Sequence, residues 1–226
     1  MMKKLLVVLA LGAISSVSIC AATGKTYVEG HVGYAKLKDV DTESFSGSVG
    51  GGTATLSARG DFDNSFAGGV EIGVGNIGDS NFRLGASYTR MDFDMEKVTG
   101  TLTTSGVSGV ANGTYSADIT RYIRDAGISL DNRVNLYMAN AYYDFKNESS
   151  FTPFVGVGMG MADVQNAKDN EFAYQGVIGG KFDIDKNMYL GLKGIYTKVN
   201  GITDELNIKY KDMDAYSGQV LLGVNF

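Results

Sequence analysis

The chain has 226 residues, a formal net charge of −5, 31 glycines, one proline, one cysteine and no tryptophan. Its mean hydropathy is close to zero. An acidic chain lacks the clustered Lys and Arg that nucleic-acid phosphates require, so nucleic acid is excluded as a partner. The length suits one β domain, and the scarcity of proline favours long paired strands.

The first 22 residues have the pattern of an export signal. Lys3 and Lys4 precede the apolar run 5–14, and small residues follow through Ala22. This pattern predicts a signal peptide over residues 1–22, cleaved after Ala22 or Ala21, and a β-barrel domain over residues 23–226.

A lipoprotein signal ending at Cys20 is the alternative. The site of lipoprotein cleavage prefers a small residue before the cysteine, and Ile19 stands there. Removal of residues 1–22 takes away the only cysteine and leaves 18 basic and 25 acidic residues, a net charge of −7. The mature chain then has no disulfide and no cysteine-based metal site.

Eight later segments alternate large apolar residues with small or polar residues at period two, which predicts β-strands. Each has about the ~9–11 residues that a tilted membrane-spanning strand needs. The segments are 26–38, 65–75, 81–94, 134–145, 151–161, 172–182, 188–197 and 216–226.

The connections alternate between long and short. Short polar turns are predicted at 76–80, 146–150 and 183–187, and long loops at 39–64 and 95–133. In the second loop, 99–114 alternatively extends a hairpin beyond the barrel rim, and 115–127 has the spacing of a short amphipathic helix. Outer-membrane barrels have short periplasmic turns and longer external loops, so both termini are expected in the periplasm.

The aromatic residues are predicted to form two bands, one at each membrane interface. The periplasmic band comprises Tyr27, Phe82, Phe145, Phe151, Phe182, Tyr189 and Phe226. The external band comprises Tyr34, Phe66, Tyr88, Phe172, Tyr174, Tyr196 and Tyr216.

The last strand and two internal segments carry a family resemblance. Val220, Leu222, Val224 and Phe226 form one apolar face that ends on an aromatic residue. This strand resembles the C-terminal strand by which the barrel-assembly machinery recognises bacterial outer-membrane barrels. Together with the segments 138–145 and 153–158, it makes the chain similar to the small outer-membrane β-barrel superfamily of opacity-type and OmpA/OmpX-type proteins.

The resemblance implies an all-β, eight-stranded, antiparallel up-and-down transmembrane barrel in contact with outer-membrane lipids and lipopolysaccharide. A soluble eight-stranded barrel is the rival, because alternation does not say which face points inward. The composition of the polar faces favours the membrane barrel. These faces are rich in Gly, Ala and Ser, whereas the exterior of a soluble barrel would be dense in Lys and Glu.

Several polar residues fall on the predicted lumen face of these strands. In a barrel of this size they either fill the lumen as a salt-bridged network or line a narrow ion path, and we favour the filled lumen. They are Glu29, His31, Glu71, Arg83, Asn140, Asp144, Gln175, Lys181, Lys193 and Gln219.

The sequence offers little for catalysis, and no catalytic, cofactor or metal residue is predicted. His31 is the only histidine, and some eight-stranded outer-membrane enzymes that modify lipopolysaccharide use a histidine. No serine is placed convincingly beside it, so a structural role is favoured. The acidic residues of loop 39–64 allow a divalent-cation site, but a solvated loop is the simpler interpretation.

The chain is therefore expected to be a non-enzymatic outer-membrane surface protein, with structural, adhesive or host-contact roles for loops 39–64 and 95–133. Host-cell surface ligands are the expected partners. The alternatives are a porin-like conduit for small solutes and a lipid-modifying enzyme that uses His31.

The terminal strand generates a first prediction. Phe226→Ser, or a charged tail added after Phe226, should impair assembly in the membrane more than it impairs any ligand contact, because the aromatic end belongs to the assembly signal. The measurement is the amount of barrel at the cell surface, and normal surface levels would count against the interpretation.

Overall fold

The computed structural model describes residues 24–38, 40–127, 131–165, 167, 169–201 and 212–226. The predicted signal peptide lies outside these residues. The described elements are β1 (Lys25–Leu37), β2 (Val40–Asp41), β3 (Phe45–Val49), β4 (Gly52–Phe62), β5 (Asn64–Gly75), the 3₁₀ turn η1 (Ile77–Asp79), β6 (Phe82–Ser105), β7 (Gly113–Asp118), α2 (Thr120–Asp125), β8 (Asp131–Asp144), β9 (Phe151–Val164), β10 (Glu171–Asp183), β11 (Met188–Val199) and β12 (Met213–Asn225). Among the described residues, no helix is long and apolar enough to cross a membrane.

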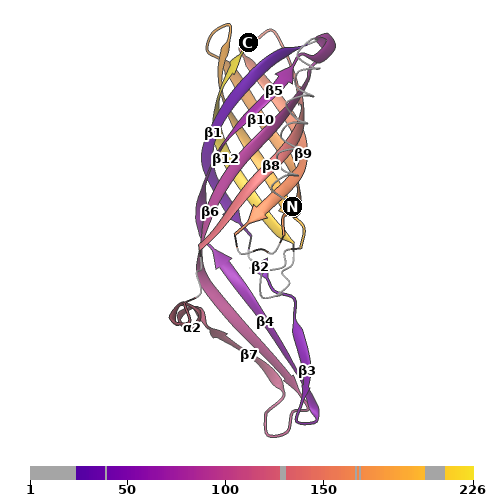
Figure 1. Ribbon diagram of the computed structural model, residues 1–226, viewed down its shortest axis with the longest axis vertical. Helices are drawn as coiled ribbons and strands as arrows, with labels where there is room; N and C mark the ends of the chain where they lie inside the picture. Colours follow the sequence, from indigo (N-terminus) through magenta and orange to yellow (C-terminus); the bar gives the residue numbers. More distant parts are fainter. Residues whose placement is uncertain (1–23, 39, 128–130, 166, 168, 202–211) are drawn as a thin grey trace.

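Eight of the strands close into a barrel (Figure 1). Their order around the wall is β1-β5-β6-β8-β9-β10-β11-β12, with every pair antiparallel and β12 paired again with β1. The predicted all-β, eight-stranded, up-and-down barrel is thus confirmed. Closure leaves no exposed edge in the barrel wall.

The closing pair, β1 with β12, joins the two ends of the barrel sheet. Their register runs from Tyr27 opposite Asn225 to Leu37 opposite Ala215, and the Phe226 amide donates to the Thr26 carbonyl at 2.8 Å. The same end of the barrel holds the three short turns, including η1. We call it the turn end, and the opposite end the sheet end.

The two faces of the wall have opposite chemistry. The outward side chains are apolar and exposed, as in Val157, Ile178 and Leu192, each 64–67% exposed. The inward side chains include buried carboxylates such as Glu29 and Glu71. This is the inverse of a soluble barrel, and it is the arrangement that a lipid-facing wall requires.

The aromatic bands are present with two corrections. Residues such as Phe82 and Phe182 point outward at the turn end, with 54% and 53% exposure. Tyr27 and Tyr189 do not belong to that band, because they are only 1% and 2% exposed and lie in the lumen. The alternation that turns Glu29 inward also turns Tyr27 inward.

The predicted loops 39–64 and 95–133 are largely β-structure. β6 leaves the barrel wall and continues as the centre of a second sheet, which we call the outer sheet; it consists of β2, β3, β4, β7 and residues 95–105 of β6 (Figure 1). The four longer segments lie in the order β3-β4-β6-β7. The interpretation of 39–64 as a loop was wrong, and the hairpin alternative for 99–114 was right.

Two local devices shape the outer sheet. Gly50 and Gly51 both have positive φ (55° and 84°), which a two-residue hairpin between β3 and β4 needs and which glycine adopts without strain. At the base of the sheet, Asp61 pairs with Lys97 but Phe62 pairs with Met95, so Glu96 has no cross-strand counterpart. Such a β-bulge bends the strand and increases its twist.

The short helix predicted within 115–127 is α2. Asp118 accepts hydrogen bonds from the Thr120 hydroxyl (2.5 Å) and the Thr120 amide (2.9 Å) before its first turn. These bonds hold the pKa of Asp118 below its ordinary value. The Thr120 hydroxyl also accepts from the Val98 amide at 2.8 Å, which ties the start of α2 to β6.

Candidate functional site

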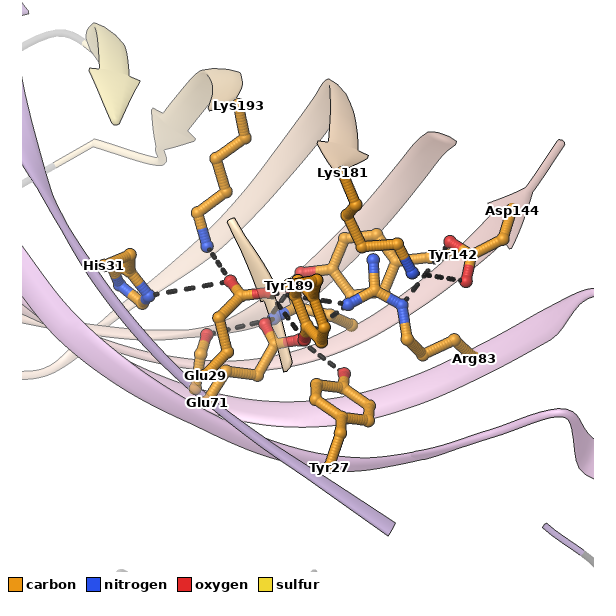
Figure 2. A network of polar contacts seen from close by, with 12 residues as sticks. Tyr27, Glu29, His31, Glu71, Arg83, Tyr142, Asp144, Lys181, Tyr189 and Lys193 are labelled. Atoms are coloured by element: carbon orange, nitrogen blue, oxygen red, sulfur yellow. Dashed lines mark hydrogen bonds and ion pairs between the residues drawn. The ribbon is translucent and has the colours of Figure 1, made fainter. Parts of the chain in front are cut away.

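The barrel lumen contains a charged network near the turn end (Figure 2). Its centre is a pair of carboxylates that the β1–β5 register places directly opposite each other, Glu29 and Glu71. Both are almost fully buried, at 2% and 1% exposure. Like charges at opposed positions destabilise a sheet, so this pair depends on a counter-ion.

Arg83 supplies that counter-ion from β6. Its Nη1 lies 3.6 Å from Glu29 Oε2 and 4.0 Å from Glu71 Oε1. Its Nε lies 3.5 Å from Asp144 Oδ1, an ion pair without the geometry of a hydrogen bond. One guanidinium therefore contacts carboxylates from three strands, a task for which its planar fork is suited.

Aromatic rings hold the guanidinium in place. The Arg83 Cζ lies 4.2 Å from the ring centroid of Tyr142, 5.0 Å from that of Tyr27 and 5.1 Å from that of Phe154. Cation–π attraction of this kind is stronger away from water, and Arg83 is only 4% exposed.

Each carboxylate has further partners of its own. Glu71 accepts hydrogen bonds from the hydroxyls of Tyr27 (2.5 Å) and Tyr142 (2.7 Å) and from Asn140 Nδ2 (2.9 Å). Glu29 accepts from Lys193 Nζ at 2.8 Å and from the Tyr189 hydroxyl at 3.3 Å. Asn140 is linked in turn to Gln175, whose Nε2 donates to Asn140 Oδ1 at 2.7 Å.

The network is balanced in charge. Lys181 Nζ donates to Asp144 Oδ2 at 2.8 Å, so three cations face three carboxylates: Arg83, Lys181 and Lys193 against Glu29, Glu71 and Asp144. We call these six residues, with Tyr27, Asn140, Tyr142, Gln175 and Tyr189, the lumen network. The two lysines are hydrogen-bonded to their carboxylates, whereas Arg83 is held by ion pairs and aromatic rings, and its Nε and Nη2 have no hydrogen-bond partner among the described residues.

Two predicted lumen residues lie at its margin. His31 Nδ1 is 4.0 Å from Glu29 Oε1, and its Nε2 is within 3.0 Å of the Thr89 hydroxyl. Gln219 Nε2 donates to the Ser217 hydroxyl at 3.3 Å and makes no described contact with the charged groups. The structure therefore brings eight of the ten predicted residues into the network and leaves His31 and Gln219 beside it.

The tyrosines were not included in the predicted set of lumen network residues, and Tyr27 and Tyr189 were assigned to the periplasmic band. Tyr27, Tyr142 and Tyr189 occupy inward positions at period two, and that signal was available in the sequence. Glycines on facing strands make room for such rings. A Cβ at Gly179 would collide with the Phe154 ring, and one at Gly223 would collide with the Tyr189 ring.

The half of the lumen toward the sheet end is apolar, which the sequence analysis did not anticipate. We call this group the mouth cluster, and Phe62 of β4 packs against it. Its members are Ala35, Leu37, Ala67, Met91, Phe93, Val134, Leu136, Met138, Ala162, Val164, Ala173, Val199, Met213 and Ala215. The lumen thus has a charged layer and an apolar layer stacked along its axis.

No metal centre emerges from the described part of the chain, where no three His, Asp or Glu side chains cluster as metal ligands would. Asp41, from the acidic stretch considered for cation binding, pairs with Arg59 at 2.7 Å. Asp39 lies outside the described residues.

Comparison with known proteins places this architecture in a family. The sequence profile described as "Surface antigen" matches residues 16–220. Outer membrane protein PagN of Salmonella typhimurium is 27% identical over 135 residues, which is 48% of this chain and 56% of PagN. The match thus spans little more than half of that relative.

Two solved structures share the fold. Neisserial surface protein A has a TM-score of 0.56 at 13% identity, over 89% of this chain and 97% of its own. OprG from Pseudomonas aeruginosa has a TM-score of 0.52 at 12% identity, over 90% of this chain and 96% of its own. At these identities the likeness concerns the fold, and both proteins are outer-membrane or surface proteins by name.

The geometry of the lumen network predicts the effect of removing its central cation. Arg83→Met leaves Glu29, Glu71 and Asp144 without their shared counter-ion, so the free energy of unfolding should fall by about 3–5 kcal/mol. The measurement is urea-induced unfolding of the refolded protein in lipid vesicles.

Arg90→Met is the matched control. Arg90 lies on the same strand, and its pairing with Asp92 is at the surface, where an ion pair contributes about 0–1 kcal/mol. Equal losses for the two variants would show that Arg83 has no special part in the fold.

Proposed function

We propose that this chain has a non-enzymatic role in surface contact. It belongs to the surface antigen family and lies in the bacterial outer membrane as a β-barrel. The barrel is the anchor, in contact with outer-membrane lipid and lipopolysaccharide, and the outer sheet is the contact element. On this proposal the turn end and both termini face the periplasm, and the sheet end faces the outside.

The observation that carries the proposal is the continuity of β6. Its residues 95–105 extend beyond the segment paired with β8 and form the core of the outer sheet. At ~3.3 Å per residue these 11 residues reach roughly 36 Å from the barrel rim. A continuous strand holds its binding surface more rigidly than a flexible loop does.

The expected partners are ligands on host cells. The outer sheet presents many Ser and Thr hydroxyls and exposed apolar side chains such as Phe45 and Leu56, which are 76% and 56% exposed. Exposed apolar groups beside polar ones are typical of interaction surfaces.

The lumen supports the non-enzymatic, non-conducting part of the proposal. The lumen network and the mouth cluster occupy successive layers, and buried rings such as Phe93 and Phe154 (both 1% exposed) occupy its cross-section. His31 is 5% exposed and lies beside Thr89 and Glu29, so a lipid substrate has no exposed histidine to reach.

Removal of the outer sheet tests the contact role. Replacing residues 42–61 and 96–127 with short Gly/Ser linkers should leave a folded barrel and lower the number of host cells bound by at least about tenfold. Folding is checked by heat-modifiable migration in gel electrophoresis, and binding by counting adherent bacteria.

The control replaces the turn 146–150 at the opposite end with a Gly/Ser linker of equal length, which should leave adhesion unchanged. Adhesion that survives loss of the outer sheet while the barrel remains folded would refute the contact role.

Planar-bilayer recording tests the filled lumen. The refolded protein should show no sustained unitary current steps, because both layers of the lumen are packed. Phe93→Ala combined with Leu136→Ala opens the mouth cluster and serves as the comparison. Reproducible steps from the unaltered protein would favour the conduit instead.

A further inference from the structure

The outer sheet has two chemically different faces. The cross-strand register sets Ser46, Thr55, Thr103 and Thr114 in one row and their neighbours Phe45, Leu56, Leu102 and Tyr115 in the adjacent row. Because neighbouring residues of a strand point to opposite faces, the first row lies on a hydroxyl face and the second on an apolar face.

The hydroxyl face is satisfied within the sheet. The Ser46 and Thr55 hydroxyls are hydrogen-bonded at 2.8 Å, and those of Thr103 and Thr114 at 3.1 Å. These four hydroxyls therefore have partners without any further molecule.

The apolar face is open along its middle and covered at both ends, by the loop 106–112 at the tip and by Ile119 beside Gly100 at the base. Phe45, Leu56, Leu102 and Tyr115 cross all four strands at one height, and they are 76%, 56%, 38% and 48% exposed. We call these four residues the apolar row. The flanking rows hold uncharged residues and are covered within the chain: Thr104 is 5% exposed and donates to the Ala111 carbonyl, and Ile119 packs over Gly100.

We propose that the apolar face binds the same face of a second copy of this chain, displayed on a facing membrane. A sheet with one apolar face is completed by a second sheet packed ~10 Å away, as in a β-sandwich. This inference goes beyond the host-contact role and needs no host ligand.

Symmetry and charge identify the occupant as a second copy. A twofold axis along the apolar row brings the row onto itself, so that Leu56 and Leu102 of each copy meet the same residues of the other. The described side chains of the row and its flanking rows carry no charge, so self-apposition brings no like charges together.

The same axis explains why the copies lie on opposite membranes. Rotation about the row reverses the strand direction, so the two barrels lie at opposite ends of the paired sheets. Phe62 lies on the same face of β4 as Leu56, and it packs against the mouth cluster of its own barrel. The apolar face is therefore turned toward the axis of its own barrel, and a copy beside it in the same membrane is poorly placed to reach it. Figure 1 shows the outer sheet projecting along the long axis, away from the barrel.

The area of the face sets the strength of the contact. The loop 106–112 and Ile119 leave about three residues per strand open, so four strands ~4.8 Å apart and three residues of ~3.3 Å give roughly 190 Å² per copy, or about 380 Å² in total. Stable soluble dimers bury about 1,200 Å² or more, so one pair binds weakly. Two membranes carrying many copies gain avidity, since each contact raises the effective concentration of the next.

Vesicle clustering tests the proposal. The full mature chain is refolded into vesicles of phosphatidylethanolamine and phosphatidylglycerol, and two batches with different fluorescent lipids are mixed. Dual-colour clusters should form when both batches carry the protein, and they should be absent when either batch is bare.

Leu56→Asp should slow clustering at least about tenfold, because it places facing carboxylates at the twofold axis. Thr55→Asp is the matched control, since it adds the same charge one residue away on the hydroxyl face, and it should cluster as the unaltered protein does. Both variants must show the heat-modifiable migration of a folded barrel.

Three outcomes would overturn the proposal. These are no clustering by the unaltered protein, equal clustering with bare vesicles (which makes lipid the partner), and equal effects of Leu56→Asp and Thr55→Asp. Host-cell adhesion is scored separately with Leu56→Asp, so loss of clustering with intact adhesion, or the reverse, separates this inference from the proposed host contact.

Discussion

The opposition of Glu29 and Glu71 is the constraint around which the barrel interior is organised. Two buried carboxylates side by side on β1 and β5 repel each other unless a cation lies between them. Arg83, on β6, is that cation. The three aromatic rings around its guanidinium belong to residues of β1, β8 and β9. The charged layer therefore links strands that are far apart in the chain, and it favours one register of the barrel wall.

Much of this fold followed from alternation alone. Period two placed Glu29, Arg83 and Lys193 inward and Ile178 and Leu192 outward, and the structure has them so. The cross-strand partner of each residue could not be predicted. Alternation determines the face on which a residue lies, but not its height relative to residues of other strands. That Glu29 lies opposite Glu71 depends on the stagger between strands, and Gln219, although opposite Lys193, turns its amide to Ser217.

The errors have physical causes. Tyr27 and Tyr189 were assigned to an interface band from their height near the strand ends, although their parity turned them inward. Residues 39–64 were predicted as a loop, and in 95–133 a hairpin over 99–114 was only the alternative, because Ser, Thr and Gly are common in loops. Thr is also a good strand former, and its alternation with Ala and Leu was the better signal.

The continuity of β6 has a mechanical consequence. Because one strand of 24 residues runs from the barrel wall to the tip of the outer sheet, a pull on the tip acts along the strand axis. The ladder hydrogen bonds of an antiparallel sheet are perpendicular to that axis, so they are loaded together in shear rather than opened one at a time. The hydrogen bonds of β6 to β5 and β8 therefore share the tension within the barrel wall. The bulge at Glu96 is the point where β6 can bend under that load.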